Sequence, residues 1–340
     1  MNPALLELIP EARREAVQAA LAHTFGRAPV DDLQPVLGGA SGASIYRFTA
    51  AGRAYVLRLD LSRDVVRDPK RHYAAMEIAA EAGVAPALHY ADPDAAISIM
   101  DLVQAQPLPA YRGGTVAMAG ELGGLLARLQ ATDGFPVLAD YAAMLERMFG
   151  YVAASDMFAP GLLEPHGEGF QGLREAYPWD PAHLVSSHND PNFRNLLFDG
   201  RRLWLVDWET AYRNEAMVDV AIQANELEAG PELADILLTA WSGRAPDARM
   251  RAQLMVMRQI TRFYYAVLIL CMQVPAPRER PDEDLTAPTA DEFRAAVAEG
   301  RLAVGSPQMM YLLGKMMLAG FLEGVRAPCV QEAADLLRQG

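Results

Sequence analysis

The chain has 340 residues, of which 51% are hydrophobic and 21% charged, and its net charge is −13. This length and apolar fraction suffice for one large domain or two lobes around a sizeable core. Because the charge is acidic and no basic block interrupts the sequence, we expect neither a nucleic-acid partner nor binding to an anionic membrane surface.

The cysteines and the N-terminus bear on the compartment. Cys271 and Cys329 show neither CxxC spacing nor a neighbouring histidine cluster, which argues against a disulfide framework and a structural zinc. The N-terminus lacks a charged start followed by a long apolar run, so we expect no signal peptide. The most apolar stretch, residues 264–274, is too short to cross a bilayer. We therefore expect a cytoplasmic protein.

The N-terminal part of the chain predicts a small sheet accompanied by helices. Apolar residues at helical spacing behind Pro3 predict a helix over residues 3–25, and a second helix is expected over residues 68–82, ending at Gly83. Strand patterns occur around a glycine-rich turn and further along the chain, at residues 36–48, 55–59, 84–90 and 97–100.

The glycine-rich turn is a candidate for binding phosphate. In Gly38-Gly39-Ala40-Ser41-Gly42, the backbone N–H groups of Gly39, Ser41 and Gly42 can approach an anion closely. The segment does not fit the P-loop pattern, and most glycine-rich strand connections are simply tight turns. Arg58 on the next strand offers a planar, forked cation suited to phosphate; the alternative is an ordinary surface charge.

Met100 and Leu102 lie in the segment Met100-Asp101-Leu102-Val103, the expected hinge between this sheet and the mostly helical remainder of the chain. Beyond it, the proline-rich segment 275–288 predicts a polar, mobile loop. The long helices between residues 247 and 324 suit a homodimer interface as well as a core. The helices expected after the hinge cover residues 115–131, 138–155, 217–228, 231–242, 247–274, 289–299, 307–324 and 329–339.

The most informative segment is Ser-His-Asn-Asp-Pro-Asn-Phe-Arg-Asn at residues 187–195. Asp190 is a candidate base for taking a proton from a hydroxyl, and Asn195, five residues later, a candidate metal ligand. His188 is expected to hold the loop through a hydrogen bond from its ring to nearby backbone. The alternative is a loop aspartate and asparagine that only cap turns.

A β-hairpin explains the spacing to the next acidic residues. Apolar runs at residues 196–198 and 203–206 flank Asp199-Gly200, a strong hairpin signal. Such a turn brings Asn195 and Asp207 together at the open end. One amide, one carboxylate and the phosphates of ATP suffice for Mg²⁺, which prefers hard oxygen ligands and keeps several waters. Glu209 is a candidate for a second metal or for the substrate.

These motifs resemble the aminoglycoside phosphotransferase and choline/ethanolamine kinase superfamily, and its choline kinase branch matches best. The resemblance covers about residues 30–230 and rests on the catalytic segment and on a longer pattern, Asp207-Trp208-Glu209, Asn214, Asp219 and Asn225-Glu226.

The resemblance implies an α+β, protein-kinase-like two-lobe fold. A small antiparallel-sheet N-lobe with an N-terminal helix, the glycine-rich loop and the phosphate-contacting Arg58 would span residues 1–102. A larger, mainly helical C-lobe with the catalytic loop, metal site and substrate pocket would span residues 103–340. ATP and Mg²⁺ are the cofactors implied, and the resemblance implies that backbone groups of Met100 and Leu102 at the hinge pair with the edge of the adenine.

The sequence also departs from kinase patterns. Kinase-like folds use a helix glutamate to orient the phosphate-binding cation, and that position falls near His72; the nearest acids are Asp68 and Glu77, and the sequence does not choose between them. Asp-Phe-Gly is replaced by Asp207-Trp208-Glu209, and no Ala-Pro-Glu follows. We therefore expect a small-molecule substrate rather than a peptide.

The acceptor is predicted by class only. Glu226 matches an acid that the choline branch uses, and Trp208 and Tyr212 are candidate aromatic faces for a quaternary ammonium. Where the branch has a tyrosine, Thr210 stands here and suits a polyol or amino alcohol. We expect ATP- and Mg²⁺-dependent phosphorylation of a choline/ethanolamine-like or other amino alcohol. The alternatives are an aminoglycoside- or sugar-type kinase, a non-catalytic nucleotide-binding protein, and a hydrolase or membrane-surface protein.

Overall fold

The computed structural model describes residues 6–36, 43–61 and 67–339, which fall into two compact units. The first unit joins the residues up to Val137 with 185–219 and 240–243, and the second contains residues 138–184, 220–239 and 244–340. Gly39, Ser41 and Gly42, predicted to contact phosphate, lie outside the described residues. The lobe boundary near residue 102 stays a prediction.

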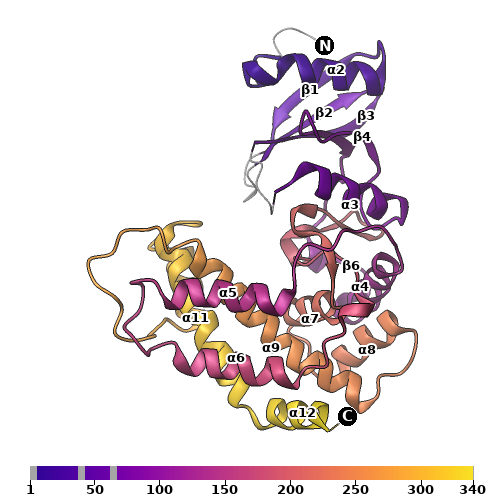
Figure 1. Ribbon diagram of the computed structural model, residues 1–340. Helices are drawn as coiled ribbons and strands as arrows, with labels where there is room; N and C mark the ends of the chain where they lie inside the picture. Colours follow the sequence, from indigo (N-terminus) through magenta and orange to yellow (C-terminus); the bar gives the residue numbers. More distant parts are fainter. Residues whose placement is uncertain (1–5, 37–42, 62–66, 340) are drawn as a thin grey trace. The chain divides into compact units, whose positions relative to one another are not determined.

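An antiparallel sheet forms the N-terminal part of the first unit, and its described strands run in the order β1-β2-β3-β5-β4. Alternate residues of β2 and β3, including Phe48, Leu57 and Leu59, are buried in one cluster with Val17 and Leu21 of helix α2, which lies across the sheet in Figure 1. The bounds are α2 Arg14–Phe25, β1 Val30–Pro35, β2 Ala43–Ala50, β3 Arg53–Asp60, β4 Leu88–Asp92 and β5 Ile97–Asp101.

The helix predicted over residues 3–25 is interrupted before Pro10: Leu6 is helical, and a turn occupies residues 7–9. A 3₁₀ turn, η1 (Glu11–Arg13), follows Pro10 and leads directly into α2. Proline lacks an N–H and fits just before or at the first turn of a helix, so helical structure at this position starts after Pro10 rather than continuing through it. Helix α3 (Pro69–Glu81) begins as expected, because the Asp68 side chain accepts a hydrogen bond from the Lys70 N–H (3.0 Å).

The predicted hairpin is present. Strands β7 (Leu196–Phe198) and β8 (Leu203–Leu205) pair antiparallel, with Leu197 opposite Trp204. The Asp199 carboxylate accepts from the N–H groups of Arg201 and Arg202, each at 2.8 Å, and Gly200 takes the positive φ of 89° that closes the turn.

A second two-stranded ladder is formed by the residues that precede and follow the hairpin in the sequence. Strand β6 (Val185–Ser187) pairs with β9 (Tyr212–Asn214), so the chain entering the catalytic segment runs antiparallel to the chain leaving Asp207. Helix α4 (Gly114–Gln130) packs against β6 and β8. Short 3₁₀ turns occur at η2 Leu108–Ala110, η3 Pro181–His183, η4 Phe193–Asn195 and η5 Trp208–Thr210.

The second unit is helical and is centred on α9 (Ala248–Cys271), which contacts α5, α6, α11 and α12 (Figure 1). By length and composition alone α9 could cross a membrane, but 61% of its most apolar window is buried, as in the core helix of a folded unit. The other bounds are α5 Tyr141–Ala153, α6 Glu164–Ala176, α7 Met217–Glu226, α8 Pro231–Ser242, α10 Ala290–Ala298, α11 Pro307–Arg326 and α12 Pro328–Arg338.

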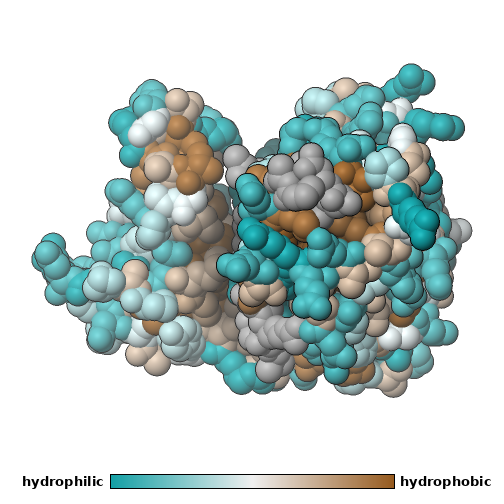
Figure 2. All heavy atoms as spheres, turned by 90° about the horizontal axis from the view of Figure 1, so that it is seen from above, coloured by the Kyte–Doolittle hydropathy of each residue, from teal (hydrophilic) through white to brown (hydrophobic). Residues whose placement is uncertain are grey.

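The proline-rich segment 275–288, predicted to be mobile, is tied down near its centre. The backbone of Asp282 pairs with Met157 (3.0 Å) and Ala159 (2.7 Å), and its carboxylate accepts from the Tyr311 hydroxyl (2.7 Å) and the Lys315 ammonium (2.9 Å). These bonds fix the segment to α11 and to the residues that precede α6. On the face shown in Figure 2, hydrophilic residues cover most of the surface and hydrophobic residues form separate patches.

Candidate active site

The loop after β6 is held by a buried carboxylate. Asp219, in the first turn of α7, is 0% exposed and accepts hydrogen bonds from the N–H groups of His188 and Asn189, each at 2.8 Å. Burial raises the pKa of Asp219, although the His188 ring and these two N–H groups oppose the rise. Asn189 has a φ of 65°, which non-glycine residues rarely adopt, so Asp219 fixes a strained turn immediately before Asp190.

The Asn189 side chain connects this loop to the segment after Asp207. Its amide nitrogen donates to the carbonyls of Thr210 (3.0 Å) and Tyr212 (3.2 Å), and its oxygen accepts from Asn214 (2.7 Å). The Thr210 hydroxyl in turn donates to the carbonyl of His188 (3.0 Å). Sequence reasoning gave Asn189 no role, and Thr210 serves the loop backbone here.

His188 has the architectural contacts expected of it. Its Nε2 donates to the carbonyl of Val206 (3.0 Å), at the end of the hairpin, and its ring packs on Trp208 with centroids 4.6 Å apart. Burial lowers the pKa of His188, which favours the neutral ring. Trp208 is 1% exposed and Tyr212 4%, so the two aromatic rings predicted to contact substrate lie in the interior of the first unit.

Asp190 is oriented by two amides. Its Oδ1 accepts from the Asn192 amide (2.6 Å), and its Oδ2 and carbonyl accept from the Asn195 amide at 3.1 and 2.9 Å. The amide nitrogen of Asn195 is thus used by Asp190, which leaves the amide oxygen as the group that a metal could take. The carbonyl of Asn195 accepts from the Val206 N–H (2.9 Å), so the hairpin places Asn195 beside the residue that precedes Asp207, as its spacing predicts.

Arg58 connects the sheet to the two acids that follow the hairpin. Its guanidinium donates to Asp60 (Nε to Oδ1, 2.8 Å), to Asp207 (Nη1 to Oδ1, 3.3 Å) and to Glu209. Burial alone would lower the pKa of Arg58, but the charges of these carboxylates raise it, so the side chain stays charged at 5% exposure. Asp207 has a φ of 65°, a second strained position in this site.

The acid that pairs with Arg58 comes from strand β3 and not from helix α3. Asp60 lies two residues after Arg58, on the same face of the strand. His72, at the helix position expected to carry the acid, interacts with Asp60 through Nε2 (3.2 Å), and the Tyr73 hydroxyl donates to the same carboxylate. The two acids considered from the sequence have other places: Asp68 caps α3 and Glu77 is exposed.

The stability of the fold should depend on pH through the carboxylate of Asp60. Burial alone would raise the pKa of Asp60, but hydrogen bonds from His72 and Tyr73 and the charge of Arg58 lower it to about 2. Because the pKa of Asp60 is lower in the folded than in the unfolded protein, its ionised carboxylate stabilises the fold. The whole of this stabilisation is present above the unfolded pKa of about 3.9, and it is lost as the pH falls through the folded pKa. We expect Asp60→Asn to lose about 2 kcal/mol at neutral pH, and the gap to wild type to shrink by about 1 kcal/mol at pH ~3.

Urea unfolding of both proteins across this range measures the gap. A gap that stays constant from neutral to acidic pH would contradict the role given to His72 and Tyr73.

Arg71 is a further residue that sequence reasoning did not single out. It is 7% exposed and donates to the carbonyls of Glu209 and Ala211, which joins α3 to the turn after Asp207. The sequence signal for Arg71 is a basic residue in the first turn of α3, at a position on the buried face of that helix.

The remaining predicted site residues are Met100, Leu102 and Glu226. Met100 pairs with Val56 within the sheet, and the Leu102 N–H donates to the carbonyl of Ala54 (3.2 Å), so an adenine contact at Leu102 would use its carbonyl. Glu226 is exposed at the end of α7 in the second unit, next to Asn225, whose amide donates to the Arg258 carbonyl (3.0 Å).

The donor set fits Mg²⁺. Asn195 offers an amide oxygen, and Asp207 and Glu209 offer carboxylates whose side chains are 33% and 14% exposed. In the part of the chain that the structure describes, no group of three or more histidine, cysteine or acidic side chains forms a complete metal cage. A site with few protein oxygens is typical of magnesium, which takes its other ligands from phosphates and water.

Comparisons with known proteins agree on the family and the fold. A model of the phosphotransferase enzyme family matches residues 32–253. No curated protein matches the sequence. A choline/ethanolamine kinase family protein from Mesorhizobium loti is similar in structure, with a TM-score of 0.69, 18% identity, and coverage of 96% of this chain and 100% of its own.

Two further solved structures are similar to this chain. The choline kinase of Cryptosporidium parvum gives a TM-score of 0.67 at 11% identity, and a spectinomycin phosphotransferase in complex with ADP and spectinomycin gives 0.56 at 11%; each covers 96% of this chain and 98% of its own. At such identities the likeness shows the fold, and the predicted α+β, protein-kinase-like class is confirmed.

Proposed function

This chain belongs to the phosphotransferase enzyme family, and on that premise we propose that it transfers the γ-phosphoryl group of ATP to a hydroxyl of a small molecule, with Mg²⁺ as cofactor. The observation that carries the proposal is Asp190, held by Asn192 and Asn195 at the end of the hairpin that leads to Asp207. A carboxylate fixed beside hard oxygen donors is what phosphoryl transfer asks of a protein.

Each residue of the candidate active site has a separate role in the proposed reaction. Asp190 accepts the proton of the acceptor hydroxyl while the oxygen of that hydroxyl bonds to the γ-phosphorus. The bond between the γ-phosphorus and the bridging oxygen of ADP breaks, and its electron pair stays on ADP. Asn195 and Asp207, with Glu209, would hold Mg²⁺, which when bound offsets the charge of the phosphates. Arg58 supplies a charged guanidinium beside Asp207 and Glu209, where a phosphate-binding cation is needed.

The proposed acceptor is an amino alcohol of the choline or ethanolamine type. The acidic net charge and the pattern that ends in Asn225-Glu226 support it. Because Trp208 and Tyr212 are buried, a cationic head group would need carboxylates or other aromatic rings. The second candidate is an aminoglycoside or sugar, supported by the likeness to a spectinomycin phosphotransferase. A non-catalytic nucleotide-binding protein is the third.

The proposal extends to the setting of the reaction. We place the enzyme in the cytoplasm, with a small-molecule alcohol as its partner and neither nucleic acid nor membrane. The burial of α9 within the helical unit supports this placement. A homodimer through the long C-terminal helices is part of the proposal, and sedimentation equilibrium tests it.

The test is ATP consumption with Mg²⁺ against choline, ethanolamine, other amino alcohols, aminoglycosides and sugars. We expect turnover with one class of alcohol and a phosphorylated product detected by mass spectrometry. A rise in melting temperature with Mg²⁺-ATP but no turnover with any acceptor would favour the non-catalytic protein. The absence of any nucleotide binding would contradict the proposal as a whole.

A further inference from the structure

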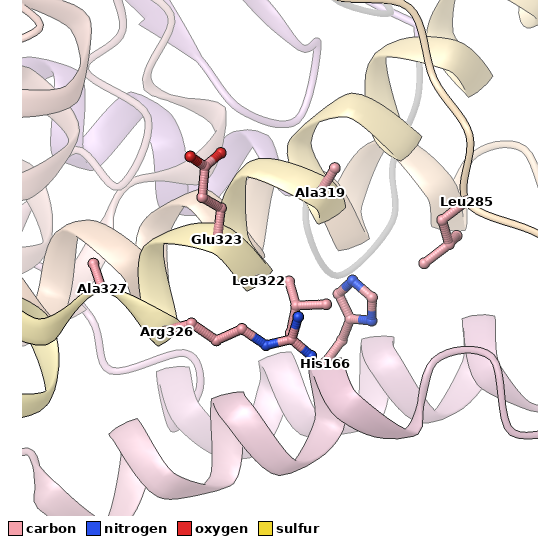
Figure 3. Close-up of a pocket in the computed structure, with 7 residues that line it drawn as sticks. All are labelled: His166, Leu285, Ala319, Leu322, Glu323, Arg326 and Ala327. Carbon is pink, nitrogen blue, oxygen red and sulfur yellow. The ribbon is translucent and has the colours of Figure 1, made fainter.

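A cavity of about 560 Å³ lies between α6 and α11 of the second unit (Figure 3). Its volume is in the range of sites for small organic molecules. None of its lining residues belongs to the candidate active site. The lining residues are His166, Leu285, Ala319, Leu322, Glu323, Arg326 and Ala327.

His166 is a buried polar group in the wall of this cavity. The residue is 1% exposed, its ring stacks on Phe321 with centroids 6.4 Å apart, and neither ring nitrogen makes a hydrogen bond of normal geometry, although the Leu318 backbone lies near enough to the ring to raise its pKa. Buried polar side chains are nearly always paired, so an unpaired imidazole in a cavity wall indicates a bound group. Burial lowers the pKa of His166; the Leu318 backbone opposes this and the charge of Arg326 adds to it, so the ring is neutral and can both donate and accept.

Arg326 brings a positive charge to the same cavity. In Figure 3 its guanidinium reaches toward the His166 ring, while Glu323 points away from it. Arg326 is exposed, and within the described part of the chain its guanidinium makes no hydrogen bond and no ion pair with a carboxylate. Its position in the last turn of α11 suits the helix dipole, but that effect does not require the guanidinium to turn toward an unpaired imidazole.

We propose that this cavity binds a carboxylate carried on a short apolar chain. The carboxylate accepts hydrogen bonds from Arg326 and His166, and the chain lies against Leu285 and Leu322. A single cation, with Glu323 at the rim, disfavours a multiply charged anion such as phosphate, and the apolar walls favour an organic body. The inference goes beyond the proposed phosphotransferase reaction and does not depend on it.

The test uses hexanoate as the probe and the full chain labelled with ¹⁵N in its histidine rings. We expect hexanoate to shift one imidazole signal saturably, and His166→Gln to identify that signal by removing it. Hexan-1-ol and hexylammonium have the same chain without the negative charge, and we expect both to bind at least about tenfold more weakly, because a charge-assisted hydrogen bond is lost.

Matched arginine variants separate this site from general surface charge. Arg326→Gln should weaken hexanoate binding by about tenfold or more, whereas Arg338→Gln, an exposed arginine on α12 paired with Asp335, should leave it unchanged. Calorimetry on both variants does not depend on whether His166→Gln folds. Equal binding of hexanoate and hexan-1-ol, unchanged binding in Arg326→Gln, tighter binding of inorganic phosphate, or no saturable binding of hexanoate would each overturn the proposal.

Discussion

Replacing Asp190 with asparagine should lower kcat by a factor of about 10²–10⁴ while nucleotide affinity stays near that of the wild type. The amide has the size of the carboxylate but cannot accept the proton of the hydroxyl. Asp190 is partly exposed and bonded to Asn192 and Asn195. One of these amides would then face an NH₂ group, which costs about 1 kcal/mol or less because water reaches the site.

The measurement is steady-state kinetics with the best acceptor from the panel, beside thermal unfolding with and without Mg²⁺-ATP. Asp180→Asn is the matched control, since it makes the same change at an exposed turn residue, and we expect its kcat to equal the wild-type value. A kcat for Asp190→Asn within about threefold of wild type would remove Asp190 from the role of base.

Much of this arrangement was predictable because its signals are local. The hairpin rests on Asp199-Gly200 between two apolar runs, and the structure has that turn with Gly200 at positive φ. Asn195 and Asp207 follow from it, since antiparallel pairing fixes which residues meet at the open end. Helices α9 and α11 also begin within one residue of their predicted starts, 247 and 307, because the side chains of Asp247 and Ser306 accept from N–H groups of the first turn.

Helix α6 is an element that the sequence did not predict. Its segment carries glycines at positions 167, 169 and 172, which lower helix propensity. The structure explains two of them by close packing: a Cβ on Gly167 would lie 2.9 Å from the Phe149 ring, and one on Gly169 would lie 3.3 Å from Val325. Tertiary packing outweighs propensity here, and a reading of local pattern does not contain that information.

The partner of Arg58 was missed for a different reason. The resemblance directed attention to a helix acid near His72, while the acid lies two residues along the same strand. The spacing of Arg58 and Asp60 was a usable signal, because residues i and i+2 of a strand share a face. The long-range contacts of His72 and Tyr73 with Asp60 could not be inferred from either segment alone.

Asp219→Asn should reduce both stability and turnover, which distinguishes it from the Asp190 variant. The carboxylate accepts from two backbone N–H groups in the buried interior, and an amide offers only one oxygen to them. A buried N–H left without an acceptor costs about 1–3 kcal/mol, partly offset because the variant no longer buries a charge. Because the strained turn at Asn189 loses one of its bonds, we expect kcat to fall by about 10²-fold, the effect of a small misplacement of a catalytic group.

Urea unfolding and kinetics on the same preparation test this, with Asp247→Asn as the matched control. Asp247 also accepts a backbone N–H (2.8 Å), but its side chain is 53% exposed at the start of α9, and asparagine caps a helix as well as aspartate, so little change is expected. A loss of stability without a loss of kcat would mean that Asn189, through Thr210, Tyr212 and Asn214, holds the loop by itself. A loss of kcat without a loss of stability would mean that the two backbone hydrogen bonds of Asp219 add little to the free energy of unfolding. The loss of kcat would then come from the missing charge of Asp219, which would have a part in the reaction.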